Sequence, residues 1–284
     1  MKQRWLVTGS SKGLGRAIVH AALDNGHHVV ATARDTDGLA DLSLRYGDRV
    51  MILRLDVTNA DEVSATVERA VDQFGGLDVV VNNAGYGTIN SIEDATLADI
   101  RNEIETNLFG TIMVTKAVIP VFREQRSGHF INFSSVGGRL GAPGRGAYSA
   151  AKWGVEGFSE VLAGEMALFG VKVTIIEPGG FRTDFAGAST TLNFGRPEYD
   201  QVVGAAARTQ RAYDGRQPGD PKKAAQAILQ VAQSNAPPLR LALGSDAVKA
   251  IRAASQRWQV ELDGWEELSL STDFEQAHAP QKTN

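Results

Sequence analysis

Tyr148 and Lys152 stand four residues apart in a segment with helical periodicity, so their side chains share one face of the predicted helix. A tyrosine hydroxyl normally has a pKa of about 10 and exchanges protons poorly at neutral pH. A nearby ammonium group favours the phenolate and lowers that pKa. Ser135, which precedes the tyrosine by 13 residues, offers a hydroxyl that can hold a carbonyl group. The three residues could move a proton to or from a carbonyl oxygen, although a tyrosine–lysine pair alone is common in ordinary helices.

A glycine-rich turn near the start of the chain has the pattern of a dinucleotide site. Residues Thr8–Gly15 follow the strand-like run Trp5–Val7, precede a helical pattern and contain the spacing Gly-x-x-x-Gly-x-Gly. Glycines let the backbone turn sharply toward a pyrophosphate, and the helix that follows offers unpaired N–H groups and a positive dipole end. Its position directly after the first strand strengthens a signal that is weak alone. The residues expected to contact the cofactor here are Gly9, Ser11, Lys12, Gly13 and Leu14.

The end of the second predicted strand bears on which dinucleotide binds. NAD sites usually carry an acidic residue there, which accepts a hydrogen bond from the adenosine ribose. This strand instead ends in Ala33, and Arg34 follows it. Two cations, Arg34 and Lys12, would suit the 2′-phosphate of NADP. NADP is therefore expected ahead of NAD, although Asp35 could reach a 2′-hydroxyl and both cations could be ordinary surface charges.

The elements that must position these groups alternate along the chain. Short, almost wholly apolar runs alternate with longer amphipathic segments, which is typical of right-handed βαβ units. The expected fold is α/β: a doubly wound, mostly parallel sheet of about seven strands with helices on both faces, a Rossmann fold. The expected strands are Trp5–Val7, His28–Ala33, Val50–Leu55, Asp78–Asn82, His129–Ser134, Lys172–Glu177 and Leu239–Leu243. The expected helices include Gly15–Asn25, Ala60–Phe74, Leu97–Val118, Ala147–Leu168 and Pro221–Ser234.

Composition and charge narrow the functional class. The 284-residue chain is 43% hydrophobic and 22% charged, with a net charge of −4, as in ordinary globular proteins. The absence of a basic stripe argues against nucleic-acid partners. There are no cysteines for disulfides or thiolate catalysis, and no His-x-x-x-His motif or acidic cluster indicates a metal site. No apolar stretch suits a membrane span or a signal peptide, so a cytoplasmic protein without membrane partners is expected.

Together these motifs resemble the short-chain dehydrogenase/reductase family, in its shorter single-domain form. The resemblance extends from about residue 2 to residue 243, with the matching elements in the family's order. They are Thr8–Gly15, Asp56-Val57, Asn82–Gly85, Asn107, Ser135, Tyr148 with Lys152, and Pro178-Gly179. The segment Ser134–Gly141 and the extended C-terminus are similar to those of hydroxysteroid and retinol dehydrogenase-like members.

The resemblance implies further contacts with the cofactor. Asp56 is expected to accept a hydrogen bond from the adenine amino group, beside a backbone contact from Val57. The turn after the fourth strand is expected to pass along the adenosine ribose, because strand carboxyl ends border the ligand crevice. The turn after the sixth strand is expected to border the nicotinamide. Thr183 is expected to contact the carboxamide of the nicotinamide through its hydroxyl. The implied contacts are Asp56, Val57, Asn83, Ala84, Gly85, Pro178, Gly179 and Thr183, joined by Tyr148 and Lys152.

The resemblance also implies a mechanism. Tyr148 donates a proton to the carbonyl oxygen in reduction and accepts one in alcohol oxidation. Lys152 lowers the tyrosine pKa and holds the nicotinamide ribose hydroxyls. Ser135, preferred over Ser134 for its spacing from the tyrosine, orients and polarises the carbonyl. Asn107 positions a water that joins Lys152 to the solvent.

Two segments depart from the regular alternation. Residues 185–220 are weakly periodic and follow the turn expected beside the nicotinamide. A mobile, part-helical lid over the substrate is expected there, with an ordered accessory helix pair as the alternative. Residues 246–275 are expected to form a C-terminal helical extension that covers either the substrate pocket or an oligomer face. One domain over residues 1–284 is expected, assembled as a homodimer or homotetramer.

The expected function is NADP-dependent hydride transfer between the nicotinamide and a carbonyl or secondary alcohol. Aromatic residues in or near the lid segment favour an apolar or aromatic small molecule. The alternative from another class is a regulator on the same fold that binds NAD(P) and senses redox state without turnover. The presence of Ser135, Tyr148 and Lys152 together disfavours that alternative. A serine hydrolase is poorly supported, because no Gly-x-Ser-x-Gly motif surrounds either candidate serine.

Overall fold

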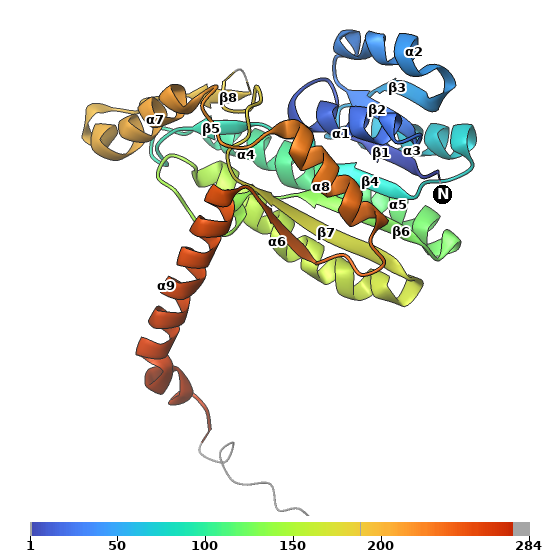
Figure 1. Ribbon diagram of the computed structural model, residues 1–284. Coiled ribbons are helices and arrows are strands. Elements are labelled where there is room, and N and C mark those ends of the chain that lie inside the picture. The colour runs from blue at the N-terminus through green and yellow to red at the C-terminus, as the bar shows by residue number, and fades with distance from the viewer. Residues whose placement is uncertain (1, 188, 275–284) are drawn as a thin grey trace, which may run out of the picture.

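The centre of the molecule is a seven-stranded parallel sheet, seen in the computed structural model that describes residues 2–187 and 189–274 (Figure 1). Its strands are β1 (Arg4–Val7), β2 (His28–Ala33), β3 (Val50–Arg54), β4 (Val79–Asn82), β6 (Gly128–Phe133), β7 (Val171–Pro178) and β9 (Arg240–Leu243). They lie in the order β3-β2-β1-β4-β6-β7-β9, and all neighbours run parallel. The predicted doubly wound fold is confirmed, with each expected strand within one residue of its predicted bounds.

Helices cover both faces of this sheet (Figure 1). One face carries α1 (Gly13–Asp24), α2 (Ala40–Tyr46) and α8 (Pro221–Gln233). The other carries α3 (Ala60–Phe74), α5 (Gly110–Gln125) and α6 (Gly146–Met166). Helix α4 (Leu97–Ile104) continues into α5 through a π-helical turn, η3 (Glu105–Phe109). Short turns complete the core: η1 (Asp37–Leu39), η2 (Gly47–Arg49), η4 (Val136–Gly138) and η5 (Ala167–Phe169).

Strand side chains alternate between two buried cores. In β1, Trp5 and Val7 point into the core beneath α1, α2 and α8, whereas Leu6 points into the core beneath α3, α5 and α6. All three side chains are fully buried. A strand covered on both faces has no solvent side, which explains why these strands are continuous apolar runs in the sequence.

The predicted helix Leu97–Val118 is longer in the structure and continues through Pro120 to Gln125. A proline inside a helix removes one backbone hydrogen bond. Packing compensates for that loss, because Phe122 is fully buried and its ring centre lies 4.8 Å from that of Phe130 in β6.

Two short strands have no counterpart in the sequence prediction. They are β5 (Gly87–Ile89) and β8 (Thr190–Leu192), which pair in parallel as a separate two-stranded sheet. Each has only three residues, so neither forms an apolar run that marks it as a strand. Their pairing attaches the region after residue 185 to the loop that follows β4.

A buried chain of polar side chains links the middle of the sheet to two helices. Asn82 and Asn132 are paired across β4 and β6, and the Asn82 Nδ2 donates to the Asn132 Oδ1 over 2.9 Å. The Asn82 Nδ2 also donates to the Thr115 Oγ1 in α5 over 3.0 Å. The Asn132 Nδ2 donates to the Ser159 Oγ in α6 over 2.9 Å. Side-chain hydrogen bonds therefore hold both strands against both helices.

The C-terminal helix α9 (Ser245–Leu270) projects away from the rest of the fold (Figure 1). Ala247 and Ala254 in its first half are buried, whereas residues 255–270 are all exposed. The expected helical extension over residues 246–275 thus corresponds to α9 up to residue 270. The part of that prediction beyond residue 274 lies outside the described residues.

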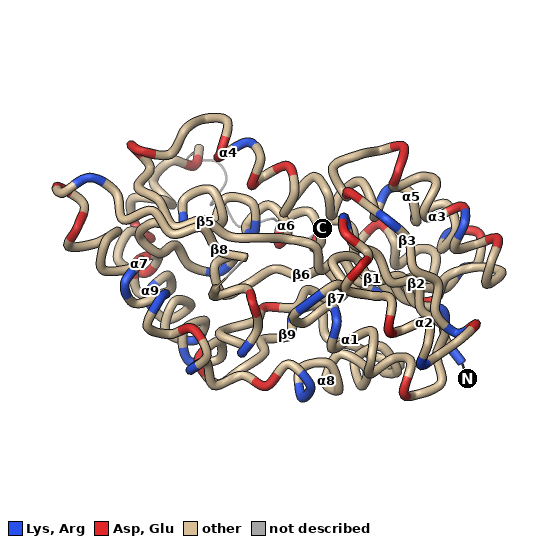
Figure 2. Tube along the Cα trace, turned by 90° about the horizontal axis from the view of Figure 1, so that it is seen from above, with Lys and Arg blue, Asp and Glu red and all other residues tan. Residues whose placement is uncertain are grey.

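Charged residues of both signs are mixed along the described chain (Figure 2). Within residues 2–187 and 189–274, no helix has the length and apolar character needed to cross a membrane. The same part of the chain holds no group of three or more His, Asp or Glu residues arranged to bind a metal ion.

Candidate active site

One large cleft, of about 1280 Å³, opens at the carboxyl ends of the strands. The strand order reverses between β1 and β4, which lie side by side. Such a switch point is where ligands bind in open α/β sheets. Every residue that the sequence assigned to the site lines this cleft: Gly9, Ser11, Lys12, Gly13, Leu14, Arg34, Asp56, Val57, Asn83, Ala84, Gly85, Asn107, Ser135, Tyr148, Lys152, Pro178, Gly179 and Thr183.

Glycines shape the turn between β1 and α1. Gly9 and Gly13 have φ angles of 67° and 61°, a region that favours glycine. A Cβ atom on Gly15 would collide with the Gly9 carbonyl oxygen and with the Asn83 side chain. The first turn of α1 can therefore pack this closely under the turn only because Gly15 has no side chain.

Asn83 ties the turn after β4 to the glycine turn. Its Nδ2 donates to the carbonyl oxygens of Thr8 and Gly9, over 2.9 and 3.0 Å. Lys12 precedes α1 without a side-chain capping hydrogen bond. The N-terminus of α1 therefore faces the cleft without a capping side chain, an arrangement that suits an anion.

Two exposed cations, Lys12 and Arg34, stand at the end of the cleft near β2. Asp35, the carboxylate that could reach a ribose hydroxyl, turns back on its own segment. Its Oδ1 accepts a hydrogen bond from the backbone N–H of Asp37 over 3.0 Å. Two cations and one carboxylate are thus exposed here, and the carboxylate already has a backbone partner.

Asp56 follows β3 and accepts hydrogen bonds from the backbone N–H and the hydroxyl of Thr58, over 3.0 and 2.7 Å. Burial raises the pKa of this carboxyl, but those hydrogen bonds and the charge of Arg34 bring it below its usual value. Val57 packs against α5, where a Cβ on Gly110 would meet its side chain. Both residues are fixed in place by contacts within the protein.

Ser135 and Tyr148 meet at the centre of the cleft. Tyr148 is buried, and the Ser135 Oγ accepts a hydrogen bond from the Gly137 N–H over 3.0 Å. Burial raises the pKa of the Tyr148 hydroxyl above its usual value, because it outweighs the hydrogen bond with Ser135 and the charge of Arg145, which act to lower it. Ser134 is turned away toward α6. The structure therefore brings Ser135, rather than Ser134, to the tyrosine.

Lys152 is also buried, 5% exposed, and its Nζ donates to the Phe133 carbonyl oxygen over 2.8 Å. The Nζ lies 5.8 Å from the centre of the Tyr148 ring. Burial lowers the pKa of Lys152 to about 8, against the charges of Glu103 and Glu156, which raise it. The lysine is thus close to its titration range at neutral pH.

Asn107 lies in the π-helical turn η3, a feature often found at functional sites, and is fully buried. Its Oδ1 accepts from the Tyr86 N–H over 3.2 Å, and its Nδ2 donates to the Tyr86 carbonyl over 2.9 Å. A Cβ on Gly85 would collide with this carboxamide. Asn107 therefore fixes the loop after β4, close to Lys152.

The turn after β7 joins three parts of the molecule. The Gly180 N–H donates to the Asp246 Oδ2 at the start of α9 over 2.7 Å. A Cβ on Gly179 would collide with the same carboxylate. Thr183 lies close to the glycine turn, because a Cβ atom added to Gly13 would lie 3.4 Å from the Thr183 Cβ. The region after β7 therefore closes over the glycine turn.

Arg145 was not predicted as a site residue, yet it lines the cleft one helical turn before Tyr148. Its guanidinium carbon lies 5.7 Å from the centre of the Tyr148 ring, and its Nη2 donates to the Gln210 Oε1 over 2.9 Å. Its Nη1 is buried and has no hydrogen-bond partner among the described residues. Two basic side chains, Arg145 and Lys152, therefore lie close to the tyrosine ring.

Glu103 is a second residue that sequence reasoning missed. It is 2% exposed and accepts a hydrogen bond from the Thr88 N–H over 3.0 Å. Burial raises the pKa of Glu103 and lowers the pKa values of Arg145 and Lys152, and the Glu103 charge opposes that lowering. The available signal was its spacing, because it precedes Asn107 by four residues and so shares its helix face.

The segment 185–220 lies over the tyrosine and is partly helical. It holds β8, η6 (Pro197–Tyr199), η7 (Asp200–Gly204) and α7 (Ala205–Tyr213). The ring of Phe185 lies 5.8 Å from that of Tyr148. Arg196 forms an ion pair of 2.6 Å with Glu93, which anchors the segment to the region after β5. The segment also shares a small separate core with β5, in which Val203 and Ala207 pack with Ile89.

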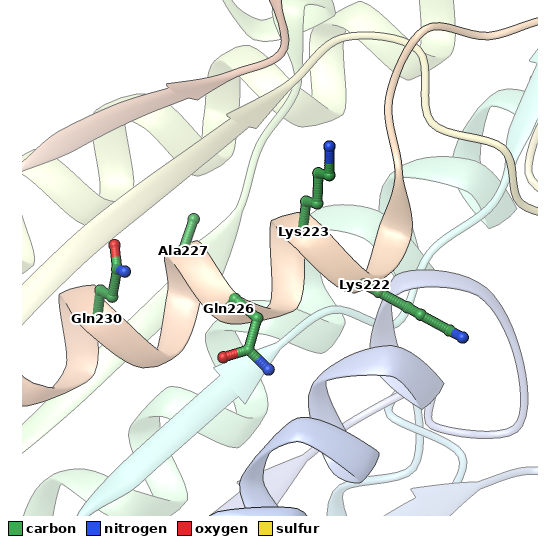
Figure 3. A pocket seen from close by; sticks show the side chains of 5 residues that line it. All are labelled: Lys222, Lys223, Gln226, Ala227 and Gln230. Carbon is green, nitrogen blue, oxygen red and sulfur yellow. The ribbon is translucent and has the colours of Figure 1, made fainter.

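A second, shallower hollow of about 360 Å³ lies along α8 (Figure 3). All its lining residues come from that one helix. Lys223, Ala227 and Gln230 point to one side of the helix, whereas Lys222 and Gln226 point to the other. Polar groups that diverge in this way do not converge on a ligand, so the large cleft is the candidate site.

Comparison with known proteins finds similarity over nearly the whole chain. The sequence model of a family described as short chain dehydrogenase matches residues 3–192. A protein named Oxidoreductase BOA17, from Botryotinia fuckeliana (strain B05.10), is 45% identical over 273 residues. That alignment covers 96% of this chain and 100% of the relative.

Solved structures show the same similarity. A short-chain dehydrogenase from Streptomyces avermitilis is 41% identical, with a TM-score of 0.91 over 96% of this chain and 100% of its own. A serine dehydrogenase, solved in its closed form with NADP+, is 29% identical with a TM-score of 0.74. It covers 84% of this chain and 94% of its own.

Proposed function

The chain belongs to the short-chain dehydrogenase/reductase family and is an NAD(P)-dependent oxidoreductase, and from this premise we propose that it is an NADP-dependent reductase of small ketones or aldehydes that also oxidises secondary alcohols. One observation supports the proposal most. The groups able to transfer a proton, Ser135, Tyr148 and Lys152, share one cleft with the glycine turn. A protein that only bound the cofactor would need the turn and not these three side chains.

The residues present fit a dinucleotide. Gly15 packs so closely against Gly9 that a side chain there would not fit, and the backbone of the turn stays uncovered. The N-terminus of α1 also has no side-chain cap, which leaves its N–H groups able to bind an anion. When bound, the cofactor supplies the hydride. The residues that would hold it are Gly9, Ser11, Lys12, Gly13, Leu14, Arg34, Asp56, Val57, Asn83, Ala84, Gly85, Tyr148, Lys152, Pro178, Gly179 and Thr183.

The choice of NADP over NAD rests on charge near β2. Lys12 and Arg34 are exposed and line the cleft, and either can bind a 2′-phosphate. Asp35 accepts a hydrogen bond from the backbone of Asp37, which occupies one of its oxygens. The residue at the end of β2 is the buried Ala33, which offers no acceptor to a ribose hydroxyl.

Four side chains of the cleft have different roles in the proposed reaction. Tyr148 donates its proton to the carbonyl oxygen in reduction and takes one back in oxidation. Ser135 donates a hydrogen bond to the same oxygen and so polarises the carbonyl. Lys152 holds ribose hydroxyls and supplies positive charge that stabilises the phenolate after proton transfer. Asn107 positions a water joining Lys152 to the solvent, through the loop that its carboxamide fixes.

The substrate that we propose is an apolar or aromatic small molecule. Beside polar residues such as Arg145, Ser149 and Gln210, the cleft that holds Tyr148 is lined by apolar and aromatic side chains. They include Val136, Leu140, Phe181, Phe185, Ala186 and Tyr213. A pocket of this kind gains affinity by removing apolar surface from water, while Ser135 and Tyr148 fix the reacting oxygen.

The direct test is oxidation of NADPH and NADH by the purified chain with a panel of ketones and aldehydes. We expect carbonyl-dependent consumption of NADPH, fastest with apolar substrates, and the reverse reaction with matching secondary alcohols. Cofactor binding without turnover on any carbonyl or alcohol would instead favour the regulator that senses redox state.

We further propose that residues 185–220 act as a lid within a single catalytic domain. Its glycines permit hinge movement, and its aromatic rings can exclude water from the tyrosine once closed. Amide hydrogen exchange should be fast in the described part of this segment in the free protein, and slower with NADP and substrate bound. The strands β4 and β6 serve as the internal control. Protection equal to theirs in the free protein, unchanged by ligands, would show an ordered accessory element instead.

A further inference from the structure

The second half of α9 carries an apolar surface that the described fold does not cover. Residues 259–270, here called the arm, are all exposed, and the arm projects away from the sheet and its helices (Figure 1). Five large apolar side chains on it are more than half exposed: Val260 72%, Leu262 59%, Trp265 63%, Leu268 60% and Leu270 52%. A helix with so much apolar surface normally packs against another surface.

The first half of α9, residues 245–258, is here called the base and lies against its own protomer. Ala247 and Ala254 are buried there. The ring of Trp258 lies 5.7 Å from that of Trp153 in α6, yet the two residues stay 38% and 47% exposed. Each copy of the chain therefore presents an apolar arm and, beside it, a partly exposed aromatic base.

The charges on the two halves of α9 have opposite signs. The exposed cations of the base are Lys249, Arg252 and Arg257, and the exposed anions of the arm are Glu261, Asp263, Glu266 and Glu267. Two parallel helices of this kind would oppose like charges along their whole length. Two antiparallel helices would place the cations of each base beside the anions of the other arm.

We propose that the arm of one copy packs antiparallel against the base of α9 in a second copy, so that two such contacts form about a two-fold axis. The apolar spacing supports this pairing, because Ile251, Trp258, Leu262 and Trp265 follow one another at intervals of seven, four and three residues, which keeps them on one helix face. In an antiparallel register, Trp265 faces the small Ser255 and Trp258 faces Leu262. The same register brings Arg252 beside Glu266.

The chain has no cysteine, so one introduced thiol reports one position. Ser255→Cys and Ser269→Cys change exposed residues of α9. In the antiparallel pair the two positions come within about 6 Å along the helix axis across copies, whereas two copies of residue 255 are offset by about 15 Å. Co-expressed variants treated with a short thiol-reactive linker should therefore give at least about fivefold more covalent dimer than either variant alone.

Ser64→Cys, on the exposed surface of α3, measures random collision between copies. Cross-linking of the mixture above this control supports the proposal. Equal cross-linking by each α9 variant alone would show a parallel pair, and no cross-linking above the control would show that the arms do not meet. Either result overturns the proposal.

A charge exchange tests the same contact without depending on one linker length. Arg252→Glu in the Ser255→Cys copy should lower the yield of mixed dimer severalfold, because it faces Glu266 of the Ser269→Cys copy. Glu266→Arg in that second copy should restore the yield. A structural defect caused by Arg252→Glu would not be repaired by a change in the other copy, so loss without rescue counts against the antiparallel pair.

Discussion

Replacement of Tyr148 by phenylalanine should lower turnover at least about a hundredfold, the scale of a lost general acid–base group. The variant keeps the ring that packs 5.8 Å from Phe185 and loses only the hydroxyl to which we assign proton transfer. Cofactor binding should survive, because the glycine turn and the N-terminus of α1 are untouched and only one of the proposed cofactor contacts is altered. Steady-state turnover with the best carbonyl substrate, together with a cofactor titration, measures both quantities.

Tyr46→Phe is the matched control. Tyr46 is buried, lies outside the cleft and donates its hydroxyl hydrogen to the Asp24 Oδ1 over 2.7 Å. Its loss should cost about 1 kcal/mol of unfolding free energy and leave turnover unchanged. Near-normal turnover by the Tyr148→Phe variant would remove Tyr148 from the proposed mechanism.

Arg34→Asp should move cofactor preference from NADPH toward NADH by at least about tenfold, since a carboxylate beside the 2′-phosphate is a like-charge contact. The new carboxylate can also accept a hydrogen bond from the ribose of NADH. Lys12 should preserve part of the NADPH affinity. Because both cations are exposed, the NADPH preference of the wild type should weaken as salt is added.

Arg45→Asp controls for the change in net charge, because Arg45 lies on α2, pairs with Asp24 and is 60% exposed. Dissociation constants for both cofactors should stay at their wild-type values in that variant. Tighter binding of NADH than NADPH by the wild type would show that Lys12 and Arg34 do not serve a 2′-phosphate.

The sheet was predictable because burial on both faces leaves a continuous signal in each strand. β2, for example, is His-Val-Val-Ala-Thr-Ala, and its predicted bounds are those of the structure. β5 and β8 lack that signal, since each is three residues long and exists through its pairing with the other. Pairing between residues about a hundred positions apart is a tertiary property that a local pattern does not contain.

The cleft was predictable where a motif has a fixed spacing, as with Tyr148 and Lys152. The roles assigned to those residues stay predictions. Arg145, just before α6, and Glu103, in α4, were missed because an arginine or glutamate is usually a solvated charge. Only the three-dimensional structure reveals that Glu103 is buried and that the half-buried Arg145 lies beside the Tyr148 ring.

The hydrogen bonds between Asn82 and Asn132 also bear on how the molecule avoids folding errors. A one-residue slip of β4 against β6 would turn one or both carboxamides away from Thr115 and Ser159 and toward the apolar core on the opposite face. Burying an amide without a hydrogen-bond partner costs free energy. Compact chains with the wrong register at β4 and β6 would therefore be less stable than the native fold. The same strands lead directly into the turns that carry Asn83 and Ser135. A chain in which β4 and β6 pair in the correct register therefore also has Asn83 and Ser135 at the correct distance from each other.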